Sequence, residues 1–398
     1  MRINIFIIII VNGDKMTNLV SLELDYEIKV SSRVHEYLSP DNVYFPIYKT
    51  SKILVKDKET VLKGQLILIN GEEKIFSSVS GVIAGLKKIK LNNEDKTYLV
   101  IANNYKEKSI KKSSKKLLEL KNKDELEKLL EENGVSLKIE NKNILLLNAI
   151  DSEPYIVNDS MYLSKNINSI LEGLDNLKCI LGLQKVIILL KNTETEILTK
   201  VNNMLGTYPD FRIVMVPNYY LIESKDNYKN YLDEDLEDIY ELSINDYCVF
   251  NEILEKNKPL TEKYITITGD EVKNPLVINV KFGTKVINII EEVIKFKNKN
   301  KVLVYYYNGL MKGYKTDISG LIVDKNFKGL VITSECKLKE ETCINCGLCL
   351  NHCPLNINPI EKLVNKKEIK CLDCGLCSYV CPSNINFKNI TKKGDRDE

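Results

Sequence analysis

Eight cysteines near the C-terminal end repeat one spacing twice, and their thiols are the groups in this chain best suited to chemistry. Each run reads C-x2-C-x2-C-x3-C-P, and the runs end at Cys353-Pro354 and Cys381-Pro382. They comprise Cys343, Cys346, Cys349 and Cys353, then Cys371, Cys374, Cys377 and Cys381. Three thiolates two residues apart on a tight loop reach three irons of one cubane cluster. Each run therefore predicts a 4Fe-4S site.

The fourth cysteine of each run is expected to bind the cluster of the other run. Two-cluster ferredoxins with this spacing exchange that ligand. A glycine, Gly347 or Gly375, provides the turn in each loop, and the proline ends the run. The predicted ligand sets are Cys343, Cys346, Cys349 and Cys381 for the first cluster, and Cys371, Cys374, Cys377 and Cys353 for the second.

Structural zinc and disulfides are the alternatives for these cysteines. Zinc sites usually take two ligand pairs separated by a longer loop, whereas here four cysteines fall within eleven residues, twice. A chain of 398 residues without a convincing export signal is expected in a reducing cytoplasm, where disulfides are rare. Clusters are therefore favoured. The other cysteines, Cys179, Cys248 and Cys336, are isolated and are expected to be inert thiols.

Composition indicates a multidomain protein without a nucleic-acid partner. The length allows two to four domains, and 44% apolar residues is ordinary for a soluble protein. The 57 basic and 55 acidic residues give a formal charge of +2, whereas phosphate binding needs a basic footprint. The two histidines, His35 and His352, and the lack of hydrolase or kinase motifs argue against acid/base catalysis. No catalytic residue is assigned.

The N-terminal segment 1–34 contains an apolar run, Ile5–Val11, that is too short to span a bilayer and lacks a small-residue cleavage site. Met16 opens a more conventional segment, so residues 1–15 are interpreted as a start-site artefact. No other stretch approaches transmembrane length. We expect a cytoplasmic protein, and a peripheral position on the cytoplasmic face of a membrane stays open.

Hydrophobic patterns along the rest of the chain predict a multidomain α/β fold. Short strand-like runs over residues 35–105 indicate a β unit. Two segments of this unit look like the hairpins of a barrel-sandwich hybrid. No lysine stands at the hairpin tip where carriers of that fold are modified, so a structural role is expected. A basic stretch, 106–123, is interpreted as a linker; a docking patch for an acidic redox partner is the alternative.

Residues 124–250 alternate helices and strands, which predicts a Rossmann-like parallel sheet with crossovers. The expected elements are a helix at 124–133, a strand at 144–147, a helix at 163–181, a strand at 186–190, a helix at 194–205 and a strand at 213–216. Such a sheet ordinarily binds a nucleotide at the carboxyl ends of its strands. Neither G-x-G-x-x-G nor G-x4-G-K-[ST] is present, so the nucleotide-binding domain is interpreted as degenerate.

Residues 251–332 are predicted to form a β-grasp unit. Strands are expected at 264–269, 277–283 and 302–307, with a helix at 285–296. Residues 333–390 form the two-cluster ferredoxin module, and the charged tail 391–398 is expected to be disordered.

These blocks, in this order, resemble the C subunit of the Rnf electron-transport complex and its soluble relatives, which include cobalamin reductases and the electron-transfer protein associated with proline reductase. The resemblance covers about residues 35–390, and its most specific phrase is CLDCGLCSYVCPSNINF at 371–387. NAIDSEPYIVND at 148–159 is a second marker. PLTEKYITITG at 259–269 is similar to the start of the family's SLBB domain, a β-grasp. NGLMKG at 308–313 stands where the family has a Gly-Gly-Pro-Met-Met-Gly turn.

Two departures from the family pattern affect its flavin pocket. The family's Gly-Gly-Ala-Gly-Phe-Pro loop is replaced by ENGVSLKIENKN at 132–143, in which Gly134 is the one glycine. Its Tyr-Pro-x-Gly-Gly segment is replaced by PNYYLIESK at 217–225. Without these glycines the backbone does not approach a phosphate closely, which argues against FMN and NADH. Glu153 aligns with the family's pocket glutamate and is the candidate cofactor-binding residue; a turn residue before Pro154 is the alternative.

The resemblance implies an iron-sulfur electron-transfer protein that passes single electrons between a donor and a membrane or soluble reductase partner. The implied partners are Rnf-type complex subunits, a ferredoxin or a soluble reductase. Three alternatives stay open: an FMN-dependent NADH- or ferredoxin-linked oxidoreductase subunit, a docking scaffold whose clusters never cycle, and an accessory of a cobalamin or selenoprotein reductase.

Overall fold

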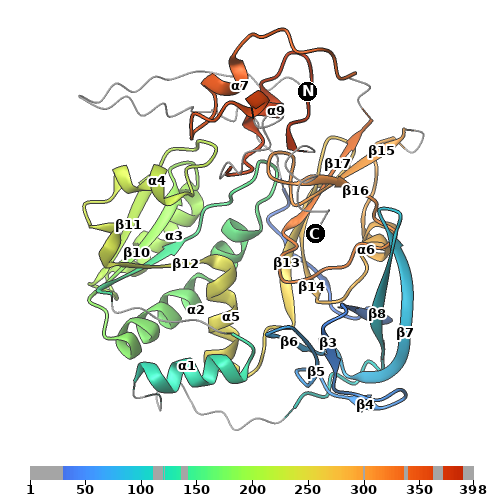
Figure 1. The fold of residues 1–398 in the computed structure, drawn as a ribbon. Helices are drawn as coiled ribbons and strands as arrows, with labels where there is room; N and C mark the ends of the chain where they lie inside the picture. The colour runs from blue at the N-terminus through green and yellow to red at the C-terminus, as the bar shows by residue number, and fades with distance from the viewer. Residues whose placement is uncertain are drawn as a thin grey trace.

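The computed structural model describes residues 30–110, 120, 122–135, 142–298, 301–335, 339–361 and 371–388. The expected start-site artefact, the middle of the basic linker, Cys336 and the C-terminal tail lie outside these residues. Figure 1 shows an α/β domain in green and yellow beside two β units in blue and orange, with the cysteine loops in red above them. No helix in the described ranges is both long enough and apolar enough to cross a bilayer.

The first β unit consists of two small sheets built from short alternating strands. One sheet has the order β2-β8-β7-β4 and the other β3-β5-β6, and all their pairings are antiparallel. The strands are β2 (Asn42–Ile47), β3 (Ser51–Ile53), β4 (Thr60–Val61), β5 (Leu66–Asn70), β6 (Glu73–Phe76), β7 (Gly81–Leu91) and β8 (Glu94–Asn103). Apolar side chains from both sheets, including Val43, Ile67 and Ile101, form one buried core.

The α/β domain is built on a four-stranded sheet in which every pairing is parallel, as the sequence predicted. Its order is β11-β10-β9-β12. The strands are β9 (Ile144–Asn148), β10 (Lys185–Lys191), β11 (Phe211–Val216) and β12 (Ile239–Ser243). The helices are α1 (Lys123–Glu132), α2 (Asn158–Leu181), α3 (Thr195–Leu205), α4 (Lys225–Tyr228) and α5 (Ile244–Lys256).

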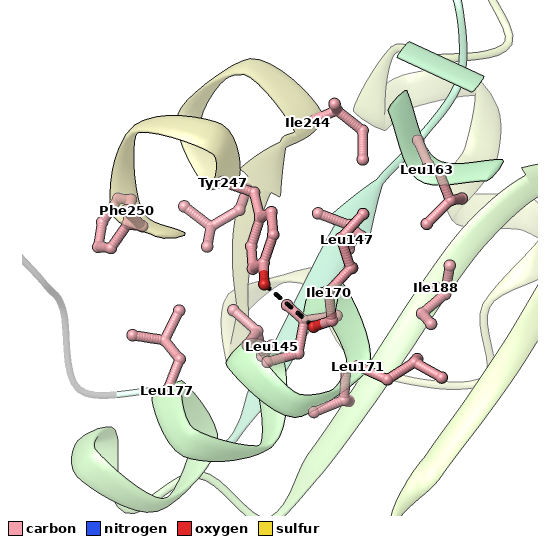
Figure 2. Close-up of a cluster of buried hydrophobic side chains, with 14 of the residues drawn as sticks. Leu145, Leu147, Leu163, Ile170, Leu171, Leu177, Ile188, Ile244, Tyr247 and Phe250 are labelled. Atoms are coloured by element: carbon pink, nitrogen blue, oxygen red, sulfur yellow. Dashed lines mark hydrogen bonds between the residues drawn. The ribbon is translucent and has the colours of Figure 1, made fainter. Parts of the chain in front are cut away.

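The two faces of this sheet bury different side chains, because successive strand residues point to opposite faces. Leu145 and Leu147 face the core formed with α1, α2, α3 and α5, whereas Leu146 faces the segment that contains α4. Figure 2 shows the first core, in which the Tyr247 hydroxyl donates a hydrogen bond to the Ile170 carbonyl at 3.1 Å. A fully buried tyrosine is tolerated there because its hydroxyl has a partner.

The second β unit is a six-stranded mixed sheet with the order β1-β14-β13-β17-β15-β16, and α6 (Val286–Val293) packs on its core. The strands are β1 (His35–Tyr37), β13 (Glu262–Thr268), β14 (Leu276–Lys281), β15 (Leu303–Tyr307), β16 (Tyr314–Thr316) and β17 (Gly329–Ser334). Strand β1 pairs with β14 in parallel. The sheet therefore includes β1, a strand from the start of residues 35–105, which were expected to form the first β unit. Helix α5 runs through residue 250, where a domain boundary was expected.

A group of four charged side chains joins the two β units. Lys281 is almost fully buried, and its ammonium lies 3.2 Å from Glu107 and 3.4 Å from Glu262. Lys63 of the first unit contacts the same two carboxylates. Burial alone would raise the pKa of Glu262, but the two ammonium groups lower it. The buried lysine is thus compensated by partners from two parts of the chain.

Candidate metal centre

The two cysteine loops have the same local structure and lie beside each other. In each loop a glycine in the left-handed conformation, Gly347 at φ 74° or Gly375 at φ 76°, precedes a one-turn helix. These helices are α7 (Leu348–Asn351) and α9 (Leu376–Tyr379), and they contact each other (Figure 1). The positive φ explains why glycine stands at both positions.

The eight cysteines line two separate cavities. One cavity is lined by Cys343, Cys346, Cys349 and Cys381, and the other by Cys371, Cys374, Cys377 and Cys353. The structure thus brings together the same two sets of four that the exchanged-ligand pattern predicts. Phe387, which is 4% exposed, lines both cavities and lies between them.

The chemistry of these cavities suits iron-sulfur clusters. All ten cysteines among the described residues are free of disulfide bonds. Backbone N–H groups donate to cysteine sulfurs, from Asn345 to Cys343 at 3.4 Å and from Asp373 to Cys371 at 3.4 Å. Such hydrogen bonds favour the thiolate and tune a cluster. Burial raises the pKa of Cys377 to about 11.

The positions of the metal-ligating side chains can be compared with the geometry of a site for one ion. Within the part of the chain that the structure describes, no three His, Cys, Asp or Glu side chains converge on the point that one ion would occupy. The cysteines of each set line one cavity.

The crevice expected to hold a nucleotide is crossed by the chain's own side chains. The strand order places the switch point between β9 and β12, where such sheets bind ligands. There the Asn148 amide donates to the Glu223 carbonyl at 2.9 Å and to the Glu241 carboxylate at 2.8 Å. The Tyr228 hydroxyl donates to the other oxygen of Glu241 at 2.9 Å. These contacts link β9, β12 and the segment after β11 across the crevice.

The first turn of α2 is capped by a carboxylate from the same chain. Asp151 accepts hydrogen bonds from the backbone N–H groups of Asp159 at 2.9 Å and Ser160 at 3.2 Å. Burial and the neighbouring Asp159 raise the pKa of Asp151. Because helix N-termini attract anions, this cap occupies a place where a phosphate would bind. It also explains why α2 begins at Asn158, five residues before the predicted start.

Gly134 contacts the first β unit. It follows α1 with φ +85°, and a Cβ added to it would lie 2.8 Å from the Phe76 ring and 3.2 Å from Cβ of Lys74. The glycine therefore serves the close packing of the α1 end against β6. Residues 136–141 of the replaced loop lie outside the described residues.

The carboxylate of Glu153 is held by the turn at 308–313. It accepts hydrogen bonds from the backbone N–H groups of Lys312 at 2.6 Å and Met311 at 3.0 Å, and the residue is 5% exposed. Gly309 lies against it, because a Cβ there would overlap a carboxylate oxygen. Burial raises the pKa of Glu153 to about 7, and the two N–H groups oppose that rise. The turn at 308–313 thus contacts the α/β domain through this side chain.

Tyr220 is a residue at this site that sequence reasoning missed. Its hydroxyl donates to the backbone carbonyl of Cys374 at 2.6 Å, and the ring packs with Leu221, Met311 and Leu376. The sequence showed only that PNYYLIESK lacks the family's glycines. No local pattern indicated a contact with a loop 154 residues away.

A cavity of about 1080 Å³ opens beside the second cysteine loop. All four parts of the chain line it, through Asn92, Tyr155, Tyr314 and Tyr379. Gly375 and Lys388 line both this cavity and the second cysteine cavity. The second loop is therefore reachable from the junction of the domains.

The raised pKa of Glu153 predicts a pH-dependent stability. An unfolded glutamate ionises near pH 4.5, whereas Glu153 ionises near 7 in the fold, so the folded state binds more protons between these values. Stability is expected to fall as pH rises through this window, by up to about 3 kcal/mol from this group. Thermal unfolding of wild type and Glu153→Gln at pH 4.5 to 8 measures it.

Glu153→Gln is expected to flatten that slope, although other buried carboxyls keep part of it. The stability that the variant retains is expected to vary little with pH from this site, because an amide does not ionise. Equal slopes for wild type and variant would contradict the assignment.

Family models and curated relatives agree with this geometry. Residues 133–228 match the Nuo51 FMN-binding domain and residues 335–392 a 4Fe-4S dicluster domain. The chain is 25% identical to the C subunit of the ion-translocating oxidoreductase complex of Buchnera aphidicola, over 80% of this chain and 74% of that protein. It is 22% identical to the C subunit of the Na⁺-translocating ferredoxin:NAD⁺ oxidoreductase complex of Acetobacterium woodii, over 54% of this chain and 51% of that one.

Other similarities cover less of the chain or of the similar protein. The C subunit of the proton-translocating ferredoxin:NAD⁺ oxidoreductase complex of Clostridium ljungdahlii is 22% identical over 54% of this chain, which spans half of that relative's length. Among solved structures, an NAD⁺-reducing NiFe hydrogenase is 10% identical with a TM-score of 0.39, covering 52% of this chain and 42% of that one. The curated relatives and the two domain matches show that the chain is a diverged, RnfC-like relative of the C subunits of the ion-translocating oxidoreductase complexes.

Proposed function

We propose that this protein is an iron-sulfur electron-transfer subunit that relays single electrons through two 4Fe-4S clusters between a redox donor and a reductase partner. The observation that carries the proposal is the grouping of eight cysteines around two cavities separated by Phe387. Each cluster, when bound, accepts and releases one electron. The chain's own part is to anchor, bury and orient that cluster.

The cysteines of each set differ in their exposure to solvent. Cys349 and Cys374 are buried and anchor the two sites from the protein side. Cys346 and Cys371 are exposed and face solvent, where a redox partner approaches. Each set therefore has one buried cysteine and one exposed cysteine.

The finer domain assignment is part of the same proposal. We assign residues 35–105 to a barrel-sandwich hybrid, 124–250 to a degenerate nucleotide-binding domain, 251–332 to an SLBB-like β-grasp and 333–390 to the ferredoxin module. The parallel sheet and the paired cysteine loops support the second and fourth assignments.

An FMN-dependent oxidoreductase subunit is the second candidate, favoured by the match of residues 133–228 to an FMN-binding domain. The described residues of that domain argue against it. Asp151 caps α2, Asn148 and Glu241 bridge the crevice, and Gly134 packs on Phe76. Asp151 thus occupies the N-terminus of α2, where a flavin phosphate would otherwise bind.

The partners are proposed from the kind of assembly to which the relatives belong. Those relatives are subunits of complexes, and two of them carry ferredoxin and NAD⁺ in their names. We infer that this chain docks with other redox subunits, a ferredoxin or a soluble reductase, in the cytoplasm or at the cytoplasmic face of a membrane.

A reductive titration of the anaerobically purified full chain tests the function. Dithionite is expected to reduce two clusters by one electron each, seen as loss of the visible cluster absorbance and new paramagnetic signals. Clusters that dithionite does not reduce would instead favour a docking scaffold whose clusters do not transfer electrons. Reduction by NADH alone, with a flavin signal, would favour the oxidoreductase candidate.

A further inference from the structure

The segment that follows β11 forms a direct contact between the α/β domain and the second cysteine loop. Tyr220 and Leu221 in this segment are both 6% exposed and pack against Met311, Cys374 and Leu376. Leu221 has a φ of +69°, which a leucine adopts rarely and only where the surroundings enforce it. The segment is therefore held in one conformation against the loop.

The Tyr220 hydroxyl directs its hydrogen toward that loop. Its oxygen lies 2.6 Å from the Cys374 carbonyl, a short hydrogen bond, and 3.5 Å from a carboxylate oxygen of Glu153. A phenol has one hydrogen, so the shorter contact takes it. The positive end of the O–H dipole thus points at a residue of the second cysteine set.

Glu153 places a negative charge behind that dipole. Its carboxylate is fixed by the N–H groups of Met311 and Lys312. Glu153, Tyr220 and Cys374 are all buried. Charges and dipoles act more strongly on each other in a buried site than in water. The second cysteine loop therefore receives a favourable dipole from Tyr220 and an opposing charge from Glu153.

The first cysteine loop is held by groups of its own module. Ser383 Oγ donates to the Thr342 carbonyl at 3.0 Å, and His352 Nδ1 lies 2.8 Å from the Leu348 carbonyl. The electrostatic surroundings of the two loops consequently differ, although their sequences are alike.

We infer that Tyr220 and Glu153 are positioning residues that set the reduction potential of the second cluster relative to the first. This inference rests on the function proposed above. Reduction adds negative charge to a cluster, so the Tyr220 dipole favours it and the Glu153 carboxylate opposes it. The degenerate nucleotide-binding domain thereby tunes one of the two clusters.

Voltammetry of the full chain with both clusters bound tests the inference, after iron analysis confirms equal loading. The assay is run at a pH well above 7, where Glu153 is ionised. Tyr220→Phe is expected to make reduction of one cluster less favourable by up to about tenfold, which is about 59 mV for one electron, and to leave the other cluster unchanged. Glu153→Gln is expected to shift the same cluster in the opposite direction.

Tyr219→Phe is the matched control. The neighbouring Tyr219 packs against the core on the sheet side of the segment, so both potentials are expected to stay at wild-type values. If Tyr220→Phe loses iron, Glu153→Gln carries the test through the sign of its shift.

A role limited to packing would give a different result. Unchanged potentials in both fully loaded variants, or shifts in the same direction, would overturn the inference while the proposed relay stands. A wild-type protein without two reducible clusters would instead overturn the proposed function itself. Opposite shifts confined to one cluster are the result expected.

Discussion

Cys374→Ala is expected to reduce the iron content from eight to four or fewer per chain. Cys374 is 8% exposed, lines the second cavity, and carries the carbonyl that Tyr220 binds. Its loss leaves the second cluster with three protein ligands and opens a gap in a packed site. Because Cys353 of the first run also lines this cavity, both runs lose a shared anchor and the whole module is destabilised. Iron and sulfide analysis with electron paramagnetic resonance measures the effect.

Two further variants make this result specific. Cys346→Ala is expected to remove the first cluster in the same way, since Cys346 lines the other cavity. Cys179→Ala is the control, because this exposed cysteine lies near the end of α2, in the α/β domain, and is expected to leave eight irons in place. Retention of eight irons by Cys374→Ala would show that the cavity does not hold a cluster.

Gly309→Ala is expected to lower the stability of the folded chain by about 2–4 kcal/mol. Gly309 has a φ of +109°, a conformation that alanine adopts at a cost. The added Cβ would also overlap the Glu153 carboxylate, so either the turn at 308–313 or Glu153 must move. Movement of the turn breaks the hydrogen bonds from Met311 and Lys312. Thermal unfolding of the loaded protein measures the loss.

Gly206→Ala provides the matched comparison. Gly206 follows α3 with an ordinary helical φ of −58°, and an added Cβ would meet no atom within 4 Å. This variant is expected to be neutral or slightly stabilising, since alanine loses less backbone entropy than glycine. Equal melting temperatures for the two variants would show that the Gly309 contact with Glu153 is dispensable.

Local sequence patterns predicted much of the fold because they report local physics. Alternation indicated the strands of the β units, and apolar spacing indicated α1, α2 and α3 to within a few residues. The parallel sheet followed from the lengths of the connections. Strand β12 and helix α5 were missed, although the strand is parallel to β9 and the helix covers the sheet. The short strand IYELS alternates weakly and passes straight into the helix, so it lacked a separating turn signal.

Contacts between segments that lie far apart in the sequence could not be predicted from such local patterns. The repeated spacing is a local pattern that indicates a loop with three convergent thiols, and the two ligand sets derived from it stay a prediction. The partners of Glu153 and Tyr220 depend instead on how three parts of the chain meet. From the sequence, Lys281 would be expected to be an exposed polar residue of a strand. Its burial is explained by its two carboxylate partners. Asp151 likewise stands seven residues before α2, too far for the usual capping pattern.

The most direct test of the account is the iron, sulfide and flavin content of one anaerobically purified sample of the full chain. Two 4Fe-4S clusters and a crevice crossed by the chain's own contacts predict eight irons, eight acid-labile sulfides and no flavin. Four or fewer irons, or bound zinc without sulfide, would contradict the two-cluster relay. Eight irons with one FMN would show that the domain at 133–228 still holds flavin, and the protein would then be an oxidoreductase subunit.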